Sequence, residues 1–366
     1  MNILLLGEYS NLHWTLAEGL RQLGHKVTVA SDGDGFKNYK RDIDLVRKSS
    51  SIKDTLSTIA SVIGNLKNFK GYDVVQLINP CFTQLNIRAN KYLYNYIRKN
   101  NQKVFLGAFG VDSFWLRACL DKKTFRYSEF FINGEENPIS DNEALKALWL
   151  NSPYESLNKE IAETCDGIIS CLYEYYIPYK AQHNSKLTYI PLPINTDKIK
   201  VAESTNNENV SFFIGINKAR SQFKGTDKLL TGLLEVSQKY PDITDISVAE
   251  SVEYSEYIKM LENSDVVLDQ LYSYTPAMNG LISMAMGKVL VGGAEPEMYE
   301  FLNEKSNMPI INVLPSDKDI FEKLEHIILT KSNLPSVKEN SRAFVETHHN
   351  YIKVAQQYVD FWTKTN

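Results

Sequence analysis

The 366-residue chain has few of the residues that would indicate disulfide bonds, metal clusters or membrane spans. Its four cysteines, Cys81, Cys119, Cys165 and Cys171, show neither CxxC spacing nor a zinc-ligand pattern, which favours buried thiols in a reducing compartment. No apolar run approaches the roughly 20 residues that a membrane-spanning helix needs. The first ten residues, MNILLLGEYS, lack the basic start and the apolar length of a signal peptide. We therefore expect a cytoplasmic protein, at most peripheral at the inner face of a membrane.

A strong excess of one charge sign is also absent. The net charge is −4, with a slightly basic first half and an acidic second half, and this balance argues against a nucleic-acid partner. The dinucleotide fingerprint GxGxxG does not occur, which counts against an NAD-dependent enzyme. Asp32-Gly33-Asp34 has the form of a metal-binding DxD motif, but it follows an early strand, away from the stretches that carry the other ligand signals. We expect no metal and no cofactor.

What the sequence does contain is a regular alternation of short apolar runs and amphipathic helices. Residues 2–6 form an apolar run, residues 12–23 space leucines at helical period before Gly24, and residues 26–30 form a second apolar run. This βαβ order predicts a parallel sheet with covering helices. The pattern continues with predicted strands at 73–77, 103–106, 167–170 and 188–191, and helices at 52–66, 83–99, 142–150 and 155–164.

A polar stretch, KVAESTNNEN (residues 200–209), separates this series from a second one and is predicted to be a linker. The second series has predicted strands at 210–216, 245–248, 266–269, 289–291 and 310–313, helices near 223–237, 254–263, 277–287, 297–304 and 317–330, and two final helices near 334–345 and 350–364. We predict an α/β fold of two Rossmann-like doubly wound domains, with a ligand cleft at the carboxyl edges of their sheets. The predicted divisions are 1–199, the linker 200–209, 210–345, and a C-terminal helix, 346–366, that returns to the first domain.

The turn after the first strand, GEYSNLHWTLAEGL, is one candidate ligand-binding stretch. A glycine between a strand and a helix N-terminus permits close approach of a phosphate or a sugar, so Gly7 is a candidate contact. A plain strand-to-helix turn would look the same. His13 either lines the ligand site or packs locally.

A second candidate is GINKARSQFKGTDKLL, which follows the first strand of the second series. Lys218, Arg220 and Lys224 gather there, with Gly225, just before a predicted helix. Cations that converge on a helix N-terminus make a diphosphate site in physical terms, because Arg can bind phosphate through two N–H groups and Lys adds a point charge. A solvated basic turn is the alternative.

A third candidate is the stretch 265–297, in which a strand is followed by an aromatic loop, a small-residue segment and a helix that ends at Gly287. Exposed backbone N–H groups that lead into a helix can hold a pyrophosphate. An ordinary strand-to-helix loop is the alternative.

These stretches, in this order, resemble the retaining GT-B glycosyltransferases of family 4, the glycosyl transferases group 1 family. GHKVTVAS is similar to the family's opening GHEVTV, YIPLPINTDKIK to the segment that closes its first domain, and SMAMGKVLVGG to its EAMAxGxPVV block. Arg220 and Lys224 resemble the donor-phosphate pair, and the ending from residue 339 onwards resembles the final helix that crosses back. The resemblance covers nearly the whole chain.

The chain departs from the family at several motif positions. Two glutamates eight residues apart flank the family's donor loop, but Tyr274 and Ile282 stand there. Val289 replaces the proline of the block, and Leu192-Pro193 replaces the linker's Asn-Gly. Loss of a charged acceptor for a ribose hydroxyl costs roughly 1.5–3 kcal/mol, so another group takes that role, the donor differs, or activity is weak. The acids nearby, none at the family's offset, are Glu250, Asp269, Glu295 and Glu297.

The resemblance implies roles for the candidate residues. Arg220 and Lys224 would stabilise the leaving diphosphate, and Asp112, in the Gly-rich turn GAFGVDSFW, would steady the reacting sugar or orient the acceptor; a helix N-cap is the alternative for Asp112. His13 would lie on the acceptor side. The implied donor-binding residues are Gly7, Lys218, Gly225, Glu250, Ser273, Tyr274, Met278, Asn279, Gly280 and Ile282.

The segment FKNYKRDIDLVRK (residues 36–48) alternates basic and apolar residues. It either docks on anionic lipid or on a lipid-linked acceptor, or it is a surface loop with a few salt bridges.

The sequence therefore predicts transfer of a sugar from a nucleoside-diphosphate sugar to a hydroxyl of a saccharide or lipid-linked saccharide, with retention, in surface polysaccharide or glycan biosynthesis. The partners expected are the nucleotide sugar, the acceptor and, peripherally, a membrane. Two alternatives remain: a catalytically degenerate GT-B protein that binds a sugar nucleotide or a partner enzyme, and a GT-B sugar-nucleotide epimerase.

Overall fold

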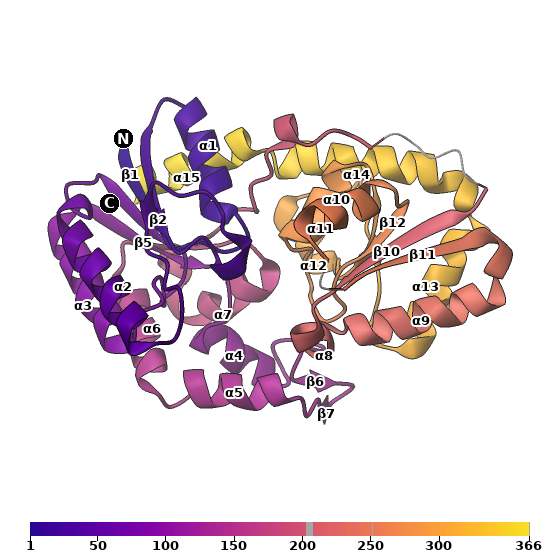
Figure 1. The fold of residues 1–366 in the computed structure, drawn as a ribbon, viewed down its shortest axis with the longest axis horizontal. Coiled ribbons are helices and arrows are strands. Elements are labelled where there is room, and N and C mark those ends of the chain that lie inside the picture. The colour runs from indigo at the N-terminus through magenta and orange to yellow at the C-terminus, as the bar shows by residue number, and fades with distance from the viewer. Residues whose placement is uncertain (203–207, 251, 366) are drawn as a thin grey trace. The chain divides into compact units, whose positions relative to one another are not determined.

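The computed structural model describes residues 1–202, 208–250 and 252–365, and it divides into two compact units (Figure 1). The first comprises Met1–Arg117, Leu145–Pro193 and Tyr351–Asn366, and the second Ala118–Ala144 and Ile194–Asn350. Each unit is built around one parallel sheet, so the predicted α/β class is confirmed. Within the described ranges, no helix is both long enough and apolar enough to cross a membrane.

The first unit contains a seven-stranded sheet of order β3-β2-β1-β4-β5-β8-β9, in which each pair of neighbours is parallel. β1 is buried along four consecutive aliphatic residues, as a central strand covered on both faces requires. The strands are β1 (Asn2–Leu6), β2 (Lys26–Ser31), β3 (Ile43–Asp44), β4 (Val74–Leu77), β5 (Lys103–Ala108), β8 (Gly167–Ser170) and β9 (Leu187–Tyr189). The helices are α1 (Leu12–Gln22), α2 (Ile52–Asn65), α3 (Ile87–Asn100), α6 (Pro153–Thr164), α7 (Tyr173–His183) and α15 (Tyr351–Lys364). The helices α4 (Ser113–Leu120) and α5 (Ser140–Trp149) each have residues in both units.

Helix α15 shares one face of this sheet with α1. From β4 onwards successive strands are added in one direction, so right-handed crossovers place α3, α6 and α7 on a single face. On the other face α15 packs along α1 (Figure 1), and Trp362 is fully buried there beside Phe105. The two helices approach closely at Gly19, where a Cβ would lie 2.3 Å from the carbonyl oxygen of Tyr351.

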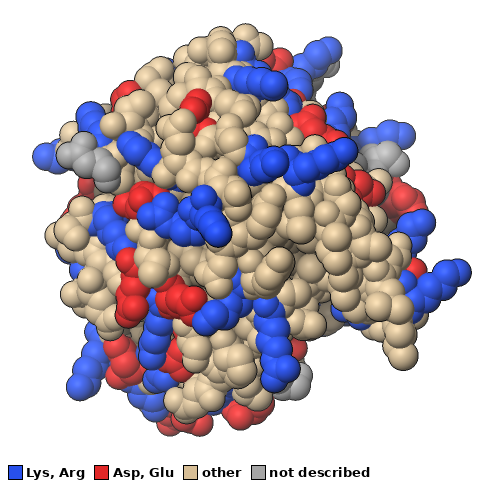
Figure 2. All heavy atoms as spheres, turned by 90° about the vertical axis from the view of Figure 1, so that its left-hand side faces the viewer, with Lys and Arg blue, Asp and Glu red and all other residues tan. Residues whose placement is uncertain are grey.

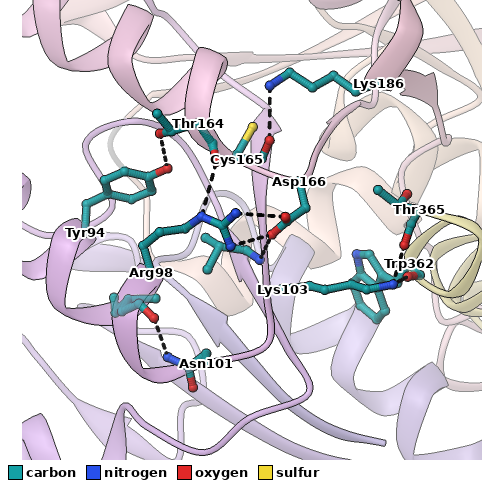
Figure 3. A network of polar contacts seen from close by, with 12 residues as sticks. Tyr94, Arg98, Asn101, Lys103, Thr164, Cys165, Asp166, Lys186, Trp362 and Thr365 are labelled. Carbon is teal, nitrogen blue, oxygen red and sulfur yellow. Dashed lines mark hydrogen bonds and ion pairs between the residues drawn. The ribbon is translucent and has the colours of Figure 1, made fainter.

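A polar network holds the amino-terminal edge of the first sheet (Figure 3). Arg98, near the end of α3, donates two hydrogen bonds to Asp166, at 2.8 and 2.9 Å, and the backbone N–H of Val104 donates to the same carboxylate at 2.6 Å. Lys103 donates to the carbonyl oxygen of Thr365, beyond the end of α15. Because α3 and α6 both end at this edge, both begin at the carboxyl edge.

The second unit contains a five-stranded parallel sheet of order β11-β10-β12-β13-β14 and a short hairpin, β6-β7. Its core gathers the apolar residues of the strands against α9 and α13. The strands are β6 (Phe131–Ile132), β7 (Glu135–Glu136), β10 (Val210–Ile216), β11 (Thr244–Glu250), β12 (Val266–Leu268), β13 (Val289–Gly292) and β14 (Ile311–Asn312). The helices are α8 (Ser221–Lys224), α9 (Thr226–Lys239), α10 (Tyr254–Glu262), α11 (Met278–Ala285), α12 (Pro296–Leu302), α13 (Asp317–Leu329) and α14 (Leu334–His348).

The observed division differs from the predicted first domain of 1–199 in two places. Residues 118–144 belong to the second unit, as do 194–199, and both ranges form hydrogen bonds within it, such as the one from the N–H of Arg126 to the hydroxyl of Tyr274. Ile194, for example, donates its N–H to the carbonyl oxygen of His349 at 2.7 Å. Of the predicted linker, residues 203–207 lie outside the described residues, and Ala202 donates its N–H to Met286 in the second unit at 3.0 Å.

Two helix predictions were also incomplete. The single helix predicted at 223–237 is two helices, because Gly225 adopts a left-handed conformation with φ +71° and ends α8. Helix α7 was not predicted at all. It contains Pro178, and its apolar residues do not gather on one face.

Candidate functional site

Two of the predicted ligand-binding stretches meet at the carboxyl edge of the second sheet. The segment after β10 carries Lys218, Arg220 and Lys224, and the carbonyl oxygen of Lys224 accepts a hydrogen bond of 2.9 Å from the N–H of Leu271, just after β12. A Cβ at Gly225 would lie 2.7 Å from the Cβ of Leu271, so the approach requires glycine. Because the strand order reverses direction between β10 and β12, this is the point at which open α/β sheets bind ligands.

The cations of this segment have different surroundings. Lys218 forms an exposed ion pair with Glu250, with Nζ and Oε2 3.1 Å apart. Arg220 is exposed, and its guanidinium carbon lies 4.8 Å from the centre of the Phe223 ring. The charge of Lys218 is therefore paired with that of Glu250, whereas the guanidinium of Arg220 is accessible to an anion.

Lys224 is half-buried and near Asp269, a carboxylate at the end of β12. The Oδ2 atom of Asp269 is buried without a hydrogen-bond partner among the described residues, and it would lie 3.0 Å from a Cβ at Gly280. Burial raises the pKa of Asp269, whereas the positive charge of Lys224 and the N–H of Ala277 act to lower it. The positive charge of Lys224 thus acts on a carboxylate that lies beside Gly280 of α11.

The loop before α11 is packed closely against the end of β13. A Cβ at Gly293 would lie 1.7 Å from the carbonyl oxygen of Ser273, so Gly293 is required for this contact. The side chain of Ser273 is buried, and its Oγ has no partner within the described part of the chain. Of the other predicted contacts, Met278 and Gly280 are buried, Ile282 is half-buried and Asn279 is exposed.

Tyr274, at the position of the family's first glutamate, binds backbone groups from a distant part of the sequence. Its hydroxyl accepts hydrogen bonds from the N–H of Arg126 at 2.6 Å and of Tyr127 at 3.3 Å. Its ring stacks on that of Tyr127, with centroids 4.9 Å apart. The tyrosine therefore holds the segment 118–144 against the rest of the second unit.

A charged cluster extends this contact, and sequence reasoning did not connect it with the site. Glu295, which is 4% exposed, accepts hydrogen bonds from Tyr127 Oη at 2.6 Å, Asn312 Nδ2 at 3.2 Å and Arg126 Nη2 at 2.7 Å. Arg126 also donates to both carboxylate oxygens of Glu297, and this hydrogen bonding lowers the pKa of Glu297. In the sequence, the aromatic run FRYSEFF around Arg126 could have indicated that this segment packs against the site.

In the first unit, the helix N-terminus after Gly7 is occupied by the carboxyl group of Glu8, whose pKa is raised by burial to about 8. Gly7 has φ +89°, and a Cβ there would lie 2.2 Å from the side chain of Ile78, so packing alone explains the glycine. Glu8 accepts hydrogen bonds from the N–H groups of His13 at 3.1 Å and Trp14 at 2.9 Å in the first turn of α1. These two amides are therefore not free for a phosphate.

His13 is fully buried, with Nδ1 2.7 Å from the carbonyl oxygen of Gly7. This contact assigns the proton to Nδ1, since the carbonyl can only accept. Burial lowers the pKa of His13 to about 3, so the ring is neutral near pH 7. Among the described residues its Nε2 has no partner.

Asp112 caps α4, as the alternative interpretation predicted. Its Oδ1 accepts from the N–H of Trp115 at 2.9 Å, and its Oδ2 accepts from the hydroxyl of Tyr179 at 2.7 Å. Burial raises the pKa of Asp112 to about 6. The catalytic assignment of Asp112 stays a prediction.

The basic segment 36–48 forms ion pairs of the kind that a surface loop makes. Lys37 pairs with Asp34 of the DxD-like sequence and Arg41 with Asp44, each at 2.7 Å, while Phe36 is exposed. On the face of the molecule shown in Figure 2, basic and acidic side chains lie next to one another. Membrane contact through this segment stays a prediction.

Solved structures of similar fold span the whole chain, although no family model and no curated protein matches its sequence. Sucrose-phosphate synthase from Thermosynechococcus elongatus is 11% identical, with 100% of this chain and 98% of that chain covered and a TM-score of 0.63. HepE from Anabaena, in complex with UDP and glucose, is 11% identical over 100% of both chains, with a TM-score of 0.62. WaaG, a glycosyltransferase involved in lipopolysaccharide biosynthesis, is 13% identical over 100% of both chains, with a TM-score of 0.59. The chain has the GT-B fold of these glycosyltransferases.

Proposed function

We propose that this protein is a glycosyltransferase that moves a sugar from a nucleoside-diphosphate sugar to a saccharide hydroxyl. The observation that carries the proposal is the meeting of the basic segment after β10 with the loop after β12, which brings the charge of Lys224 to bear on Asp269 at the end of β12. The GT-B fold supports it, because HepE of the same fold is described with UDP and glucose. UDP-sugars are therefore the donors to test first.

In this proposal the second unit binds the donor. The bond between the sugar carbon and the diphosphate oxygen breaks, and a bond to the acceptor oxygen forms. Negative charge grows on the diphosphate as it leaves, and Arg220 and Lys224 stabilise that charge more in the transition state than in the ground state. The proton of the acceptor hydroxyl passes to an oxygen of the leaving diphosphate, which gains negative charge as the bond to the sugar breaks.

We further propose that the first unit presents the acceptor, and that transfer retains the anomeric configuration, as the resemblance to family 4 implies. A place in polysaccharide biosynthesis is supported by the description of WaaG, which acts in lipopolysaccharide biosynthesis. Tyr274 and Ile282 cannot supply the charged acceptors of the family's glutamates. Donor hydroxyls are then held by backbone groups or by other acids.

Release of UDP from a panel of UDP-sugars, with and without saccharide acceptors, separates the proposal from its alternatives. A transferase releases UDP in proportion to the glycosylated product. A catalytically degenerate binder would bind the donor without release, and an epimerase would change the sugar while UDP stays attached or is replaced by water.

Arg220→Ala tests the assignment of the phosphate contact. A hydrogen bond to a charged group contributes about 1.5–3 kcal/mol, so the variant should lose at least tenfold in donor affinity or turnover. Lys323→Ala is the matched control, because Lys323 is an exposed cation on α13 of the same unit. Equal turnover by the two variants would reject the role of Arg220.

A further inference from the structure

A hollow of about 490 Å³ lies in the first unit, between the beginnings of α3 and α6. Both helices begin at the carboxyl edge of the sheet, since their other ends meet at the amino-terminal edge (Figure 3). The hollow therefore opens beside the edge at which parallel sheets bind ligands. Its lining includes Ile87, Arg88 and Lys91 from α3 and Pro153, Leu157 and Lys159 from α6.

The hollow carries more positive than negative charge. The buried carboxylate in the lining, Glu155, is already paired with two cations. It accepts two hydrogen bonds from Arg117, at 2.7 and 2.9 Å, and forms an ion pair with Lys159 at 2.8 Å. Hydrogen bonding to Arg117 lowers the pKa of Glu155 to about 2, so it stays ionised. Lys91 pairs with Glu160 on the rim.

Arg88 is the cation that remains available. It is exposed at the mouth of the hollow and has no ion pair within the described part of the chain. With Arg117, Lys91 and Lys159 it makes four cations against two carboxylates, a local excess of two positive charges. A free guanidinium in such a field recognises a phosphate or a carboxylate.

The helix ends do not account for this charge, because side chains already cap both of them. Asn86 accepts from the N–H of Ala89 at 3.0 Å, and Ser152 accepts from the N–H groups of Tyr154 and Glu155. The lining also includes three apolar residues, of which Leu157 is buried, Ile87 is half-buried and Pro153 is exposed. Apolar side chains next to cations suit the C–H face of a sugar ring that bears an acidic group.

We propose that this hollow binds the phosphate or carboxylate of an acidic saccharide acceptor, with Arg88 as the principal contact. The proposal rests on the proposed function, in which the first unit presents the acceptor. An acidic acceptor is held here at its charged group, while a neutral sugar of the same size is not. The excess charge and the free guanidinium thus select acceptors by charge.

The test compares binding of glucose 6-phosphate, glucuronic acid and glucose to the full chain by saturation-transfer NMR titration. We expect the wild type to bind at least one of the two acidic sugars at least tenfold more tightly than glucose, and preference between the two identifies phosphate or carboxylate as the natural group. Arg88→Glu should weaken this binding at least tenfold. Lys99→Glu, the same charge change at the other end of α3, should leave it unchanged.

Three outcomes overturn the proposal: equal binding of glucose and the acidic sugars, no effect of Arg88→Glu, or equal loss in Lys99→Glu. The proposal would also be overturned if the protein bound neither acidic sugar but bound phosphatidylglycerol vesicles through Arg88. The hollow would then be a membrane contact. UDP-glucose binding is measured in parallel. If neither the wild type nor any variant binds UDP-glucose, the result counts against the proposed function. If all of them bind UDP-glucose, and Arg88→Glu is the one variant that loses acidic-sugar binding, the result supports both the proposed function and the acidic-acceptor site.

Discussion

Replacing Glu295 by alanine should weaken the packing of the segment 118–144 on the rest of the second unit. Glu295 is 4% exposed and accepts hydrogen bonds from Tyr127, Asn312 and Arg126. Its removal leaves a buried tyrosine hydroxyl without its ionised acceptor. Arg126 keeps its second partner, Glu297.

The magnitude follows from these contacts. A hydrogen bond to an ionised group contributes about 1.5–3 kcal/mol, and the half-buried amide of Asn312 adds up to about 1 kcal/mol. The half-exposed ion pair with Arg126 adds little. We expect a loss of about 3 kcal/mol in the free energy of unfolding of this unit, or a fall of about 6–12 °C in its melting temperature. Glu297→Ala, which removes only the more exposed carboxylate, should cost less than about 1 kcal/mol.

Urea unfolding of Glu295→Ala, Tyr127→Phe and the double variant measures this directly. Because both single changes remove the same hydrogen bond, the effect of Glu295→Ala should be at least about 1 kcal/mol smaller in the Tyr127→Phe background. Trypsin should also cleave after Arg126 faster in Glu295→Ala than in Glu297→Ala. Additive effects, or equal losses from Glu295→Ala and Glu297→Ala, would refute the reasoning.

Two further predictions concern the first unit. Gly19→Val should destabilise the chain by about 1–3 kcal/mol, because a Cβ would lie 2.3 Å from the carbonyl oxygen of Tyr351. Thermal unfolding measures this loss of stability. Gly64→Val is the control, since nothing lies within 4 Å of a Cβ at Gly64. His13 has its pKa lowered by burial from 6.5 to about 3, so its contribution to stability is present above pH 6.5 and is lost as the pH falls from 6.5 toward 3. His13→Asn, which keeps a donor for the carbonyl oxygen of Gly7, should remove that part of the pH dependence of stability, about 1 kcal/mol between pH 6.5 and 5.5. Chemical unfolding at these pH values measures it. If the free energy of unfolding changes with pH as much in His13→Asn as in the wild type, the result counts against a neutral buried ring.

The sheets could be predicted from the sequence because their central strands are short runs of buried aliphatic residues. Residues 2–6 and 210–216 were predicted as strands, and the structure places β1 and β10 there. The stop of α1 at Gly24 was likewise predicted, since a glycine with φ +83° ends that helix. Helix α7 was missed because Pro178 lies inside it and its periodicity is weak.

The site was only partly predictable, because its missing members come from distant parts of the chain. The basic segment at 218–225 carries a local signal of charge, glycine and helix start. Nothing local indicates that Arg126 and Tyr127 lie against Tyr274 and Glu295, more than a hundred residues away. The capping of α1 by Glu8 was also missed, since a carboxyl group four positions before the first helical residue can point either to the helix or to solvent.

The central claim is that a diphosphate lies beside Lys224 at the beginning of α11, and acetylation of that lysine with and without UDP tests it most directly. Mass spectrometry of the intact chain's peptides compares the labelling rate of Lys224 with that of Lys323, which is exposed on α13. We predict that saturating UDP slows acetylation of Lys224 at least tenfold and leaves Lys323 unchanged. Bound UDP that leaves Lys224 as reactive as before would contradict the account.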